Sequence, residues 1–68
     1  MRGKINTSSQ RTGVRVHITN FEGKTDEQIK EYAQKVIDRS GWARAYKVFS
    51  LERAFRDDTT IIAHAMVP

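Results

Sequence analysis

The sequence predicts an α+β fold, with a small antiparallel three-stranded sheet and one helix on one face in the order β-α-β-β. Three observations predict it. Residues 14–21 alternate between apolar and polar side chains, residues 26–40 carry apolar side chains at helical spacing, and apolar segments at 44–55 and 59–67 flank a polar turn. Alternation over a short segment is typical of a half-buried strand, and spacings of three and four residues are typical of an amphipathic helix.

A flexible arm is expected at 1–12, ahead of a single domain at 13–68. The arm is polar apart from Met1 and Ile5 and shows no period. Such a segment buries too little apolar surface to offset the entropy of ordering it, so we expect disorder in the free protein. The alternative is a short edge strand around residues 4–7.

The net positive charge of the chain comes from its N-terminal part. The formal net charge is +4, and Arg2, Lys4, Arg11 and Arg15 all precede the first acid, Glu22. The bases and acids of the remainder balance. A surplus placed in this way can attract a phosphate backbone or an acidic protein surface, and it does not choose between them.

The first predicted strand, residues 14–20, has two chemically different faces. Val14, Val16 and Ile18 are expected on one side, and Arg15, His17 and Thr19 on the other. This pattern predicts a strand with one buried face and one solvated face.

The helix predicted at 26–40 has clear signals at both ends. Thr25 is a favourable N-cap, Gln28 completes a capping box with it, and Gly41 suits a left-handed C-cap. The apolar stripe of this helix consists of Ile29, Tyr32, Ala33, Val36 and Ile37. We expect this stripe to cover one face of the sheet.

The segments at 44–55 and 59–67 are expected to pair as an antiparallel hairpin, with Phe55 opposite Thr60. This register leaves a second, largely apolar face of the sheet uncovered, formed by Phe49, Leu51, Arg53, Phe55, Ile62, His64 and Met66. Exposed apolar patches usually mark interfaces, so self-association and partner docking are both natural uses. The alternatives are a register that differs by one residue, or a bulge near Ser50 that redirects side chains.

Size and composition narrow the class of protein. A chain of 68 residues forms one domain near the lower limit for folding alone. It has no cysteine, which excludes disulfides and thiolate sites. No apolar run is long enough for a signal peptide or a membrane span, so we expect a cytoplasmic protein, in the host cytoplasm if it is viral.

The sequence offers no set of catalytic residues. His17 and His64 are the only imidazoles, and neither has a neighbouring nucleophile and orienting group in the sequence. The Gly-Lys-Thr at 23–25 lacks the earlier glycine that a phosphate-binding P-loop needs, because position 18 is Ile18. We therefore expect a protein that is not an enzyme and that uses no metal or cofactor.

Basic and aromatic residues occur together on two predicted strands. Arg15 and His17 lie on the first, and Lys47 and Arg53 follow Tyr46 on the second. Such combinations can hold nucleic acid through phosphate pairing and base stacking. The RNP, KH, helix-turn-helix and zinc-finger patterns are absent, and a solvated charged surface is the alternative.

In size and order of elements, the chain resembles the small host-takeover proteins of bacteriophages, including the short RNA polymerase inhibitors of short-tailed phages. The resemblance covers the strand at 14–20, the helix opened by Thr-Asp-Glu-Gln at 25–28, and the strand that follows. It involves no shared residue motif. It implies a larger protein partner, bound through a charged strand or loop.

These features favour a small non-enzymatic binding protein that docks on a larger protein and modulates or inhibits it, for example in the host transcription or nucleic-acid machinery. One alternative is a nucleic-acid-binding module that uses the arm and strand face, and another is a module that dimerises through the second sheet face. The expected partner-binding residues are Arg2, Lys4, Arg11, Arg15, His17, Phe49, Leu51, Arg53, Phe55 and Met66.

Overall fold

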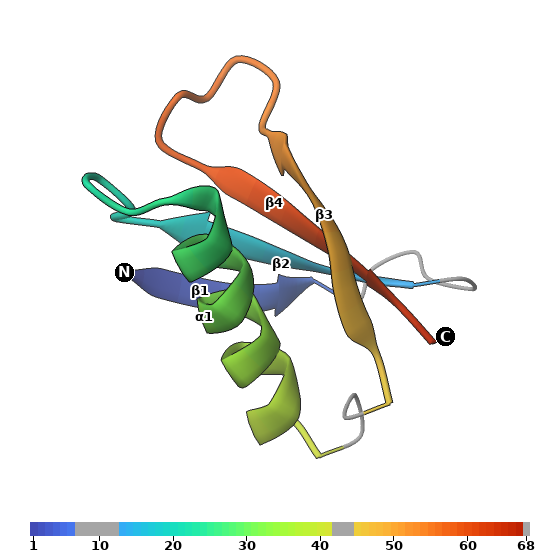
Figure 1. Cartoon of the computed structure of the whole chain (residues 1–68). Coiled ribbons are helices and arrows are strands. Elements are labelled where there is room, and N and C mark those ends of the chain that lie inside the picture. Colours follow the sequence, from blue (N-terminus) through green and yellow to red (C-terminus); the bar gives the residue numbers. More distant parts are fainter. Residues whose placement is uncertain (7–12, 42–44, 68) are drawn as a thin grey trace.

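A computed structural model describes residues 1–6, 13–41 and 45–67. The elements are β1 (Arg2–Asn6), β2 (Val14–Thr19), α1 (Asp26–Arg39), β3 (Lys47–Arg53) and β4 (Ile61–Met66). The strands form one antiparallel sheet in the order β1-β2-β4-β3. Helix α1 lies across one side of this sheet (Figure 1). The α+β class, with one helix packed on an antiparallel sheet, is confirmed.

The sheet has four strands rather than the three expected, because the segment Arg2–Asn6 pairs with β2 as an edge strand. At these residues the chain forms a short edge strand instead of the expected disordered arm. The remainder of the expected arm, residues 7–12 with Arg11, lies outside the described residues, as do Trp42 and Arg44.

Strand β1 lies close beneath α1 because Gly3, on its helix-facing side, has no side chain. Ile5 packs against the core, and Gly3 lies beneath the helix. A Cβ atom at Gly3 would come within 3.0 Å of side-chain atoms of Ile18, Tyr32 and Val36. The glycine therefore lets the helix approach β1 closely, and the same glycine removes the apolar signal that would have predicted a strand.

Helix α1 confirms the predicted stripe and its N-cap. The Thr25 hydroxyl accepts from the Gln28 backbone N–H at 3.2 Å, and the Thr25 backbone N–H donates to Gln28 Oε1 at 2.9 Å. Gly41 follows with a positive φ of 62°, which glycine adopts without steric strain. Ile29, Ala33 and Ile37 are fully buried.

The core lies between α1 and the sheet. It consists of Val14, Val16, Ile18, Ile29, Ala33, Ile37, Ile61, Ala63 and Ala65. The sheet contributes three alternate residues of β2 and three of β4 to this core, and α1 contributes the other three residues. The two alanines of β4 are small, which suits the close approach of a helix.

The pairing of β3 with β4 differs from the expected hairpin by one residue. Leu51 lies opposite Ala63, and Arg53 lies opposite Ile61, while a bulge interrupts the register between Val48 and Ser50. Both alternatives to the expected register are therefore present together. The Ala54 N–H donates to the Thr60 oxygen at 3.1 Å, so the turn begins one residue earlier than expected.

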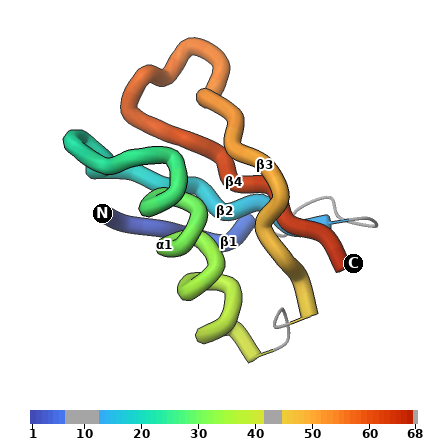
Figure 2. Tube along the Cα trace, viewed as in Figure 1, coloured from blue at the N-terminus to red at the C-terminus, as the bar shows by residue number. Residues whose placement is uncertain are grey.

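This register corrects the predicted second face. Leu51 lies on the helix side of the sheet and packs against the core. Arg53, two residues further along β3, lies on the same side of the sheet. Phe55 leaves β3 altogether and is 86% exposed in the loop between β3 and β4. Figure 2 shows this loop standing clear of the sheet and the helix.

Candidate functional site

The side of the sheet opposite α1 is covered by no other element in the described part of the chain, and we call it the outer face. Side chains alternate across each strand, so the residues that share a side with the solvated positions of β2 define it. They are Arg2, Lys4, Asn6, Arg15, His17, Thr19, Lys47, Phe49, Ser50, Glu52, Ile62, His64 and Met66.

Strand register arranges the outer face in rows that cross the sheet. The first row contains Asn6, Arg15, His64 and, at the bulge, Phe49 and Ser50; the second contains Lys4, His17, Ile62 and Glu52; the third contains Arg2 and Thr19. Directly opposite residues of antiparallel strands have Cβ atoms about 4.5–5.5 Å apart. Cations from β1 and β2 consequently lie in the same rows as side chains from β3 and β4.

The charge of the outer face is strongly positive. Arg2, Lys4, Arg15 and Lys47 lie on it, against a single acid, Glu52. Among the described residues, the one ion pair within 4.0 Å joins His64 to Glu52. The four cations are therefore not neutralised by carboxylates from the described part of this chain, and they remain able to pair with an external anion.

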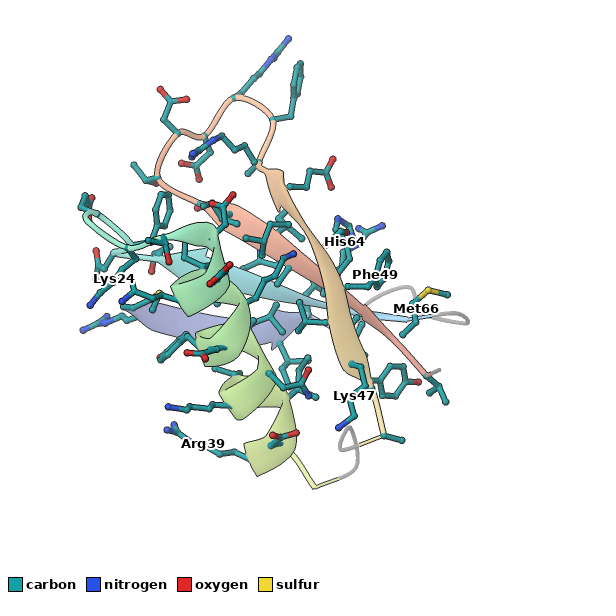
Figure 3. All side chains as sticks on the ribbon, viewed as in Figure 1. Lys24, Arg39, Lys47, Phe49, His64 and Met66 are labelled. Atoms are coloured by element: carbon teal, nitrogen blue, oxygen red, sulfur yellow. The ribbon has the colours of Figure 1, made fainter. Side chains whose placement is uncertain are left out.

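The bulge in β3 determines where the aromatic side chain of this face lies. An inserted residue makes two residues of one strand oppose one residue of its partner. Here Ser50 lies opposite His64, and Phe49 is the inserted residue between Val48 and Ser50. The ring centroids of Phe49 and His64 are 6.3 Å apart with a tilt of 47°. Phe49 remains 57% exposed. Figure 3 shows Phe49, His64 and Met66 together on the side away from α1.

The two histidines have different neighbours. His64 Nε2 lies 2.7 Å from Glu52 Oε1, which orients its ring edge towards β3. His17 Nε2 lies 3.4 Å from the Asn6 side-chain nitrogen. Among the described residues, Glu52 contacts His64, but no serine or threonine hydroxyl forms a hydrogen bond with either imidazole ring.

A shallow pocket opens at the end of the outer face where β2, β3 and β4 meet. Its volume is about 200 Å³, and it is lined by Gly13, Val14, Arg15, Phe49, His64, Ala65 and Met66. The pocket thus combines a guanidinium, two rings and a thioether with strand backbone. A second depression, of about 130 Å³, lies near the start of α1 and is lined by Asp26, Leu51, Glu52, Arg53 and Ile61.

The structure brings together six of the residues expected at the partner-binding site. Arg2, Lys4, Arg15, His17, Phe49 and Met66 all lie on the outer face. Leu51, Arg53 and Phe55 do not join them, and Arg11 lies outside the described residues.

Sequence reasoning missed Asn6, and it named Lys47 among the basic residues of a strand without including it in the partner-binding set. Asn6 belongs to β1 and could have been found from the alternation of Arg2, Lys4 and Asn6, which has the period of a strand. Lys47 could not have been placed without the register of the hairpin, because its side depends on the bulge.

The described residues hold no group of three or more histidine, aspartate or glutamate side chains that could bind a metal ion. None of their helical segments is long and apolar enough to cross a membrane. Comparisons with protein-family models, with curated proteins and with solved structures found no match to this chain.

Proposed function

We propose that this chain is a small non-enzymatic binding module whose outer face holds single-stranded nucleic acid. The observation that carries the proposal is the row arrangement, in which Arg15 of β2 shares a row with the exposed ring of Phe49 and the cations of β1 lie in the rows that follow. Unpaired bases stack on exposed aromatic side chains while their phosphates pair with nearby cations. A sheet face without a projecting helix or ribbon suits a single strand better than the major groove of a duplex.

The altered hairpin register supports a nucleic-acid ligand over the protein partner that the sequence favoured. One of the arguments for a protein partner was a broad apolar second face. With Leu51 in the core and Phe55 in the loop, the apolar members of the outer face are Phe49, Ile62 and Met66, set among four cations. Interfaces between proteins are depleted in lysine at their centres, whereas nucleic-acid interfaces are strongly positive.

The test is a titration of labelled single-stranded DNA and RNA of mixed sequence, followed by fluorescence anisotropy at several salt concentrations. For single strands, the logarithm of affinity falls with the logarithm of salt at a slope of roughly 0.7 per phosphate neutralised. The variant Arg2→Ala, Lys4→Ala, Arg15→Ala should bind much more weakly and should show a slope smaller by about two units.

A matched variant on the opposite side of the molecule provides the control. Lys30, Lys35 and Arg39 are exposed residues of α1, and Lys30→Ala, Lys35→Ala, Arg39→Ala also removes three positive charges. This variant should keep most of the affinity and the salt slope of the parent. Equal losses in both triple variants would mean that net charge alone attracts the strand, and the proposed face would be wrong.

A second candidate function is docking on a larger, acidic protein, as the sequence predicted. The observation in its favour is the exposure of Phe49, Met66 and Val67, at 57%, 44% and 53%, since exposed apolar groups beside charges also suit protein contacts. Capture from a cell lysate with and without nuclease separates the two. A specific protein that persists after nuclease treatment, and that is lost with the outer-face triple variant alone, would favour this candidate.

A dimer formed through the outer face is the remaining alternative from the sequence. Sedimentation velocity of the parent and of the outer-face triple variant tests it directly. Under the proposed function both sediment as monomers in the absence of nucleic acid. A dimer of the parent that dissociates in the variant would contradict the proposal, because the face would then be covered by a second copy.

A further inference from the structure

The pocket at the meeting point of β2, β3 and β4 differs from the rest of the outer face. Here Phe49, at the β3 bulge, and Met66 line a partly open pocket with a volume of about 200 Å³. The aromatic and apolar side chains of the outer face concentrate here, while Arg2 and Lys4 lie towards the opposite edge. This separation suggests two kinds of ligand contact on one surface.

The lining of the pocket matches the parts of a nucleotide. Phe49 and His64 present two rings 6.3 Å apart at their centroids, and Met66, 44% exposed, adds a polarisable thioether. Arg15 stands directly opposite His64 in the neighbouring strand, and it supplies a charged guanidinium at the rim. Aromatic rings accept the flat face of a base, and a guanidinium pairs with a phosphate.

One residue that lines the pocket, Gly13, has no room for a side chain. A Cβ atom at Gly13 would lie 2.5 Å from the Ala65 carbonyl oxygen, so any larger residue would push the start of β2 away from β4. Glycine at this position therefore preserves the close approach of β2 to β4 beside the pocket, which Gly13 itself lines.

The size of the pocket decides between a whole small molecule and part of a polymer. Sites that enclose a drug-sized ligand usually measure roughly 300–1,000 Å³, which is larger than the 200 Å³ found here. One flat ring system is the occupant that suits this volume. The remainder of such a ligand would lie outside, along the rows that contain Lys4 and Arg2.

We propose that this pocket is a nucleobase subsite, in which one base of a single strand packs against Phe49 and His64 while the adjoining phosphate pairs with Arg15. The inference rests on the proposed function and adds a base-contacting position to it. From there the strand continues across the second and third rows, where Lys4 and Arg2 meet further phosphates. Affinity for the polymer consequently divides into a base-dependent part at Phe49 and a base-independent part at the cations.

The experiment compares two oligonucleotides of equal length, one carrying bases and one abasic throughout, against the parent and Phe49→Ala. The change should weaken binding of the base-bearing strand roughly 5- to 150-fold, the range for loss of one stacked base. Binding of the abasic strand should stay the same. Arg15→Ala should weaken both strands, because it removes a phosphate contact.

Two further variants keep the test decisive. Phe49→Trp should restore affinity for the base-bearing strand, because it retains an aromatic surface. Phe49→Leu should behave as Phe49→Ala does while preserving apolar packing, which covers the case in which the alanine variant is less stable. Ribose and deoxyribose strands are both titrated, and the base-dependent loss is expected in whichever binds more tightly.

Failure of the subsite is distinguishable from failure of the proposed function. If Phe49→Ala weakens the abasic and base-bearing strands equally, or neither, the nucleobase subsite is wrong. The cationic face would still stand if the outer-face triple variant lost affinity while the α1 triple variant did not. No binding of either strand by the parent would overturn both.

Discussion

The two sides of the sheet use the same strands for opposite purposes. On the helix side, β2 and β4 contribute buried aliphatic residues to a core closed by α1. On the outer face, the alternate residues of the same strands are charged, imidazole or half-exposed side chains. Stability and binding therefore depend on different residues, although these residues alternate along the same strands. A change at one position of a strand should affect folding, and a change at the next should affect binding.

The largest expected effect separates two adjacent isoleucines of β4. Ile61 is 3% exposed on the helix side, whereas Ile62 is only partly buried on the outer face. Ile61→Ala should lower the free energy of unfolding by about 2–5 kcal/mol, because it leaves a cavity in the core. Ile62→Ala should cost clearly less. Denaturant unfolding of both variants measures the difference, and equal costs would mean that the outer face is a second core.

The next effect concerns how closely the helix approaches β1. Gly3→Val would place side-chain atoms where Ile18, Tyr32 and Val36 already lie within 3.0 Å of a Cβ position. Overpacking of this kind costs about 1–3 kcal/mol. Lys4→Val is the matched control, since the same residue would then lie on the outer face. Thermal unfolding should show a clear loss for the first and little change for the second; a tolerated Gly3→Val would contradict the close packing.

A smaller effect is expected where the helix protects an edge strand. The Val48 N–H donates to Gln34 Oε1 at 2.9 Å, and Gln34 Nε2 donates to the Tyr46 oxygen at 3.0 Å. One side-chain amide thus bonds the backbone of β3 as another strand would. Gln34→Ala should cost about 1–2 kcal/mol through these bonds and should speed amide exchange at Val48. Gln34→Glu keeps only the acceptor and should lie between; unchanged exchange would remove this role.

The smallest effect belongs to neither side of the sheet. Hydrogen bonds from Thr59 and Thr60 to the Asp57 carboxylate lower its pKa below the ordinary 3.8. Because the pKa of Asp57 is lower in the folded state, the ionised carboxylate stabilises the fold at pH values above the pKa of the unfolded chain. That contribution disappears as the pH falls through the folded pKa. Asp57→Asn should therefore flatten the decline in melting temperature as the pH falls below about 5; an unchanged decline would show that the loop contributes nothing.

The helix and β2 could be predicted from the sequence because their signals are local. The stripe from Ile29 to Ile37 and the capping box at Thr25 and Gln28 each lie within a few residues of chain. Strand β2 shows strict alternation between Val14 and Thr19. Local periodicity and local caps need no knowledge of distant partners.

Strand β1 and the hairpin register depend on packing between distant residues. The inward positions of β1 are Gly3 and Ile5, and a glycine gives no apolar signal even where its smallness is what the helix needs. The register depends on the turn between Ala54 and Thr60 and on a bulge at Phe49. A slip of one residue moves every side chain of a strand to the other face, which is why Leu51 was expected outside and lies inside.

For the same reason, the candidate site could be predicted from the sequence only in part. The cationic side of β2 follows from alternation, so Arg15 and His17 could be placed beside one another from sequence. Lys47 and the position of Phe49 beside His64 could not, because they depend on the β3–β4 register. The pocket is a consequence of three strands meeting, and no single segment encodes it.

The most direct measurement is a titration of isotope-labelled protein with a short single-stranded oligonucleotide, followed by amide chemical shifts in NMR spectra. If the outer face holds nucleic acid, the largest shift changes occur at Arg15, His17, Phe49 and His64, with smaller changes at Lys4. Amides of the exposed side of α1, such as Lys30 and Lys35, should stay near their free positions. Changes concentrated on α1 or at Phe55, or none at saturating oligonucleotide, would contradict binding at this face.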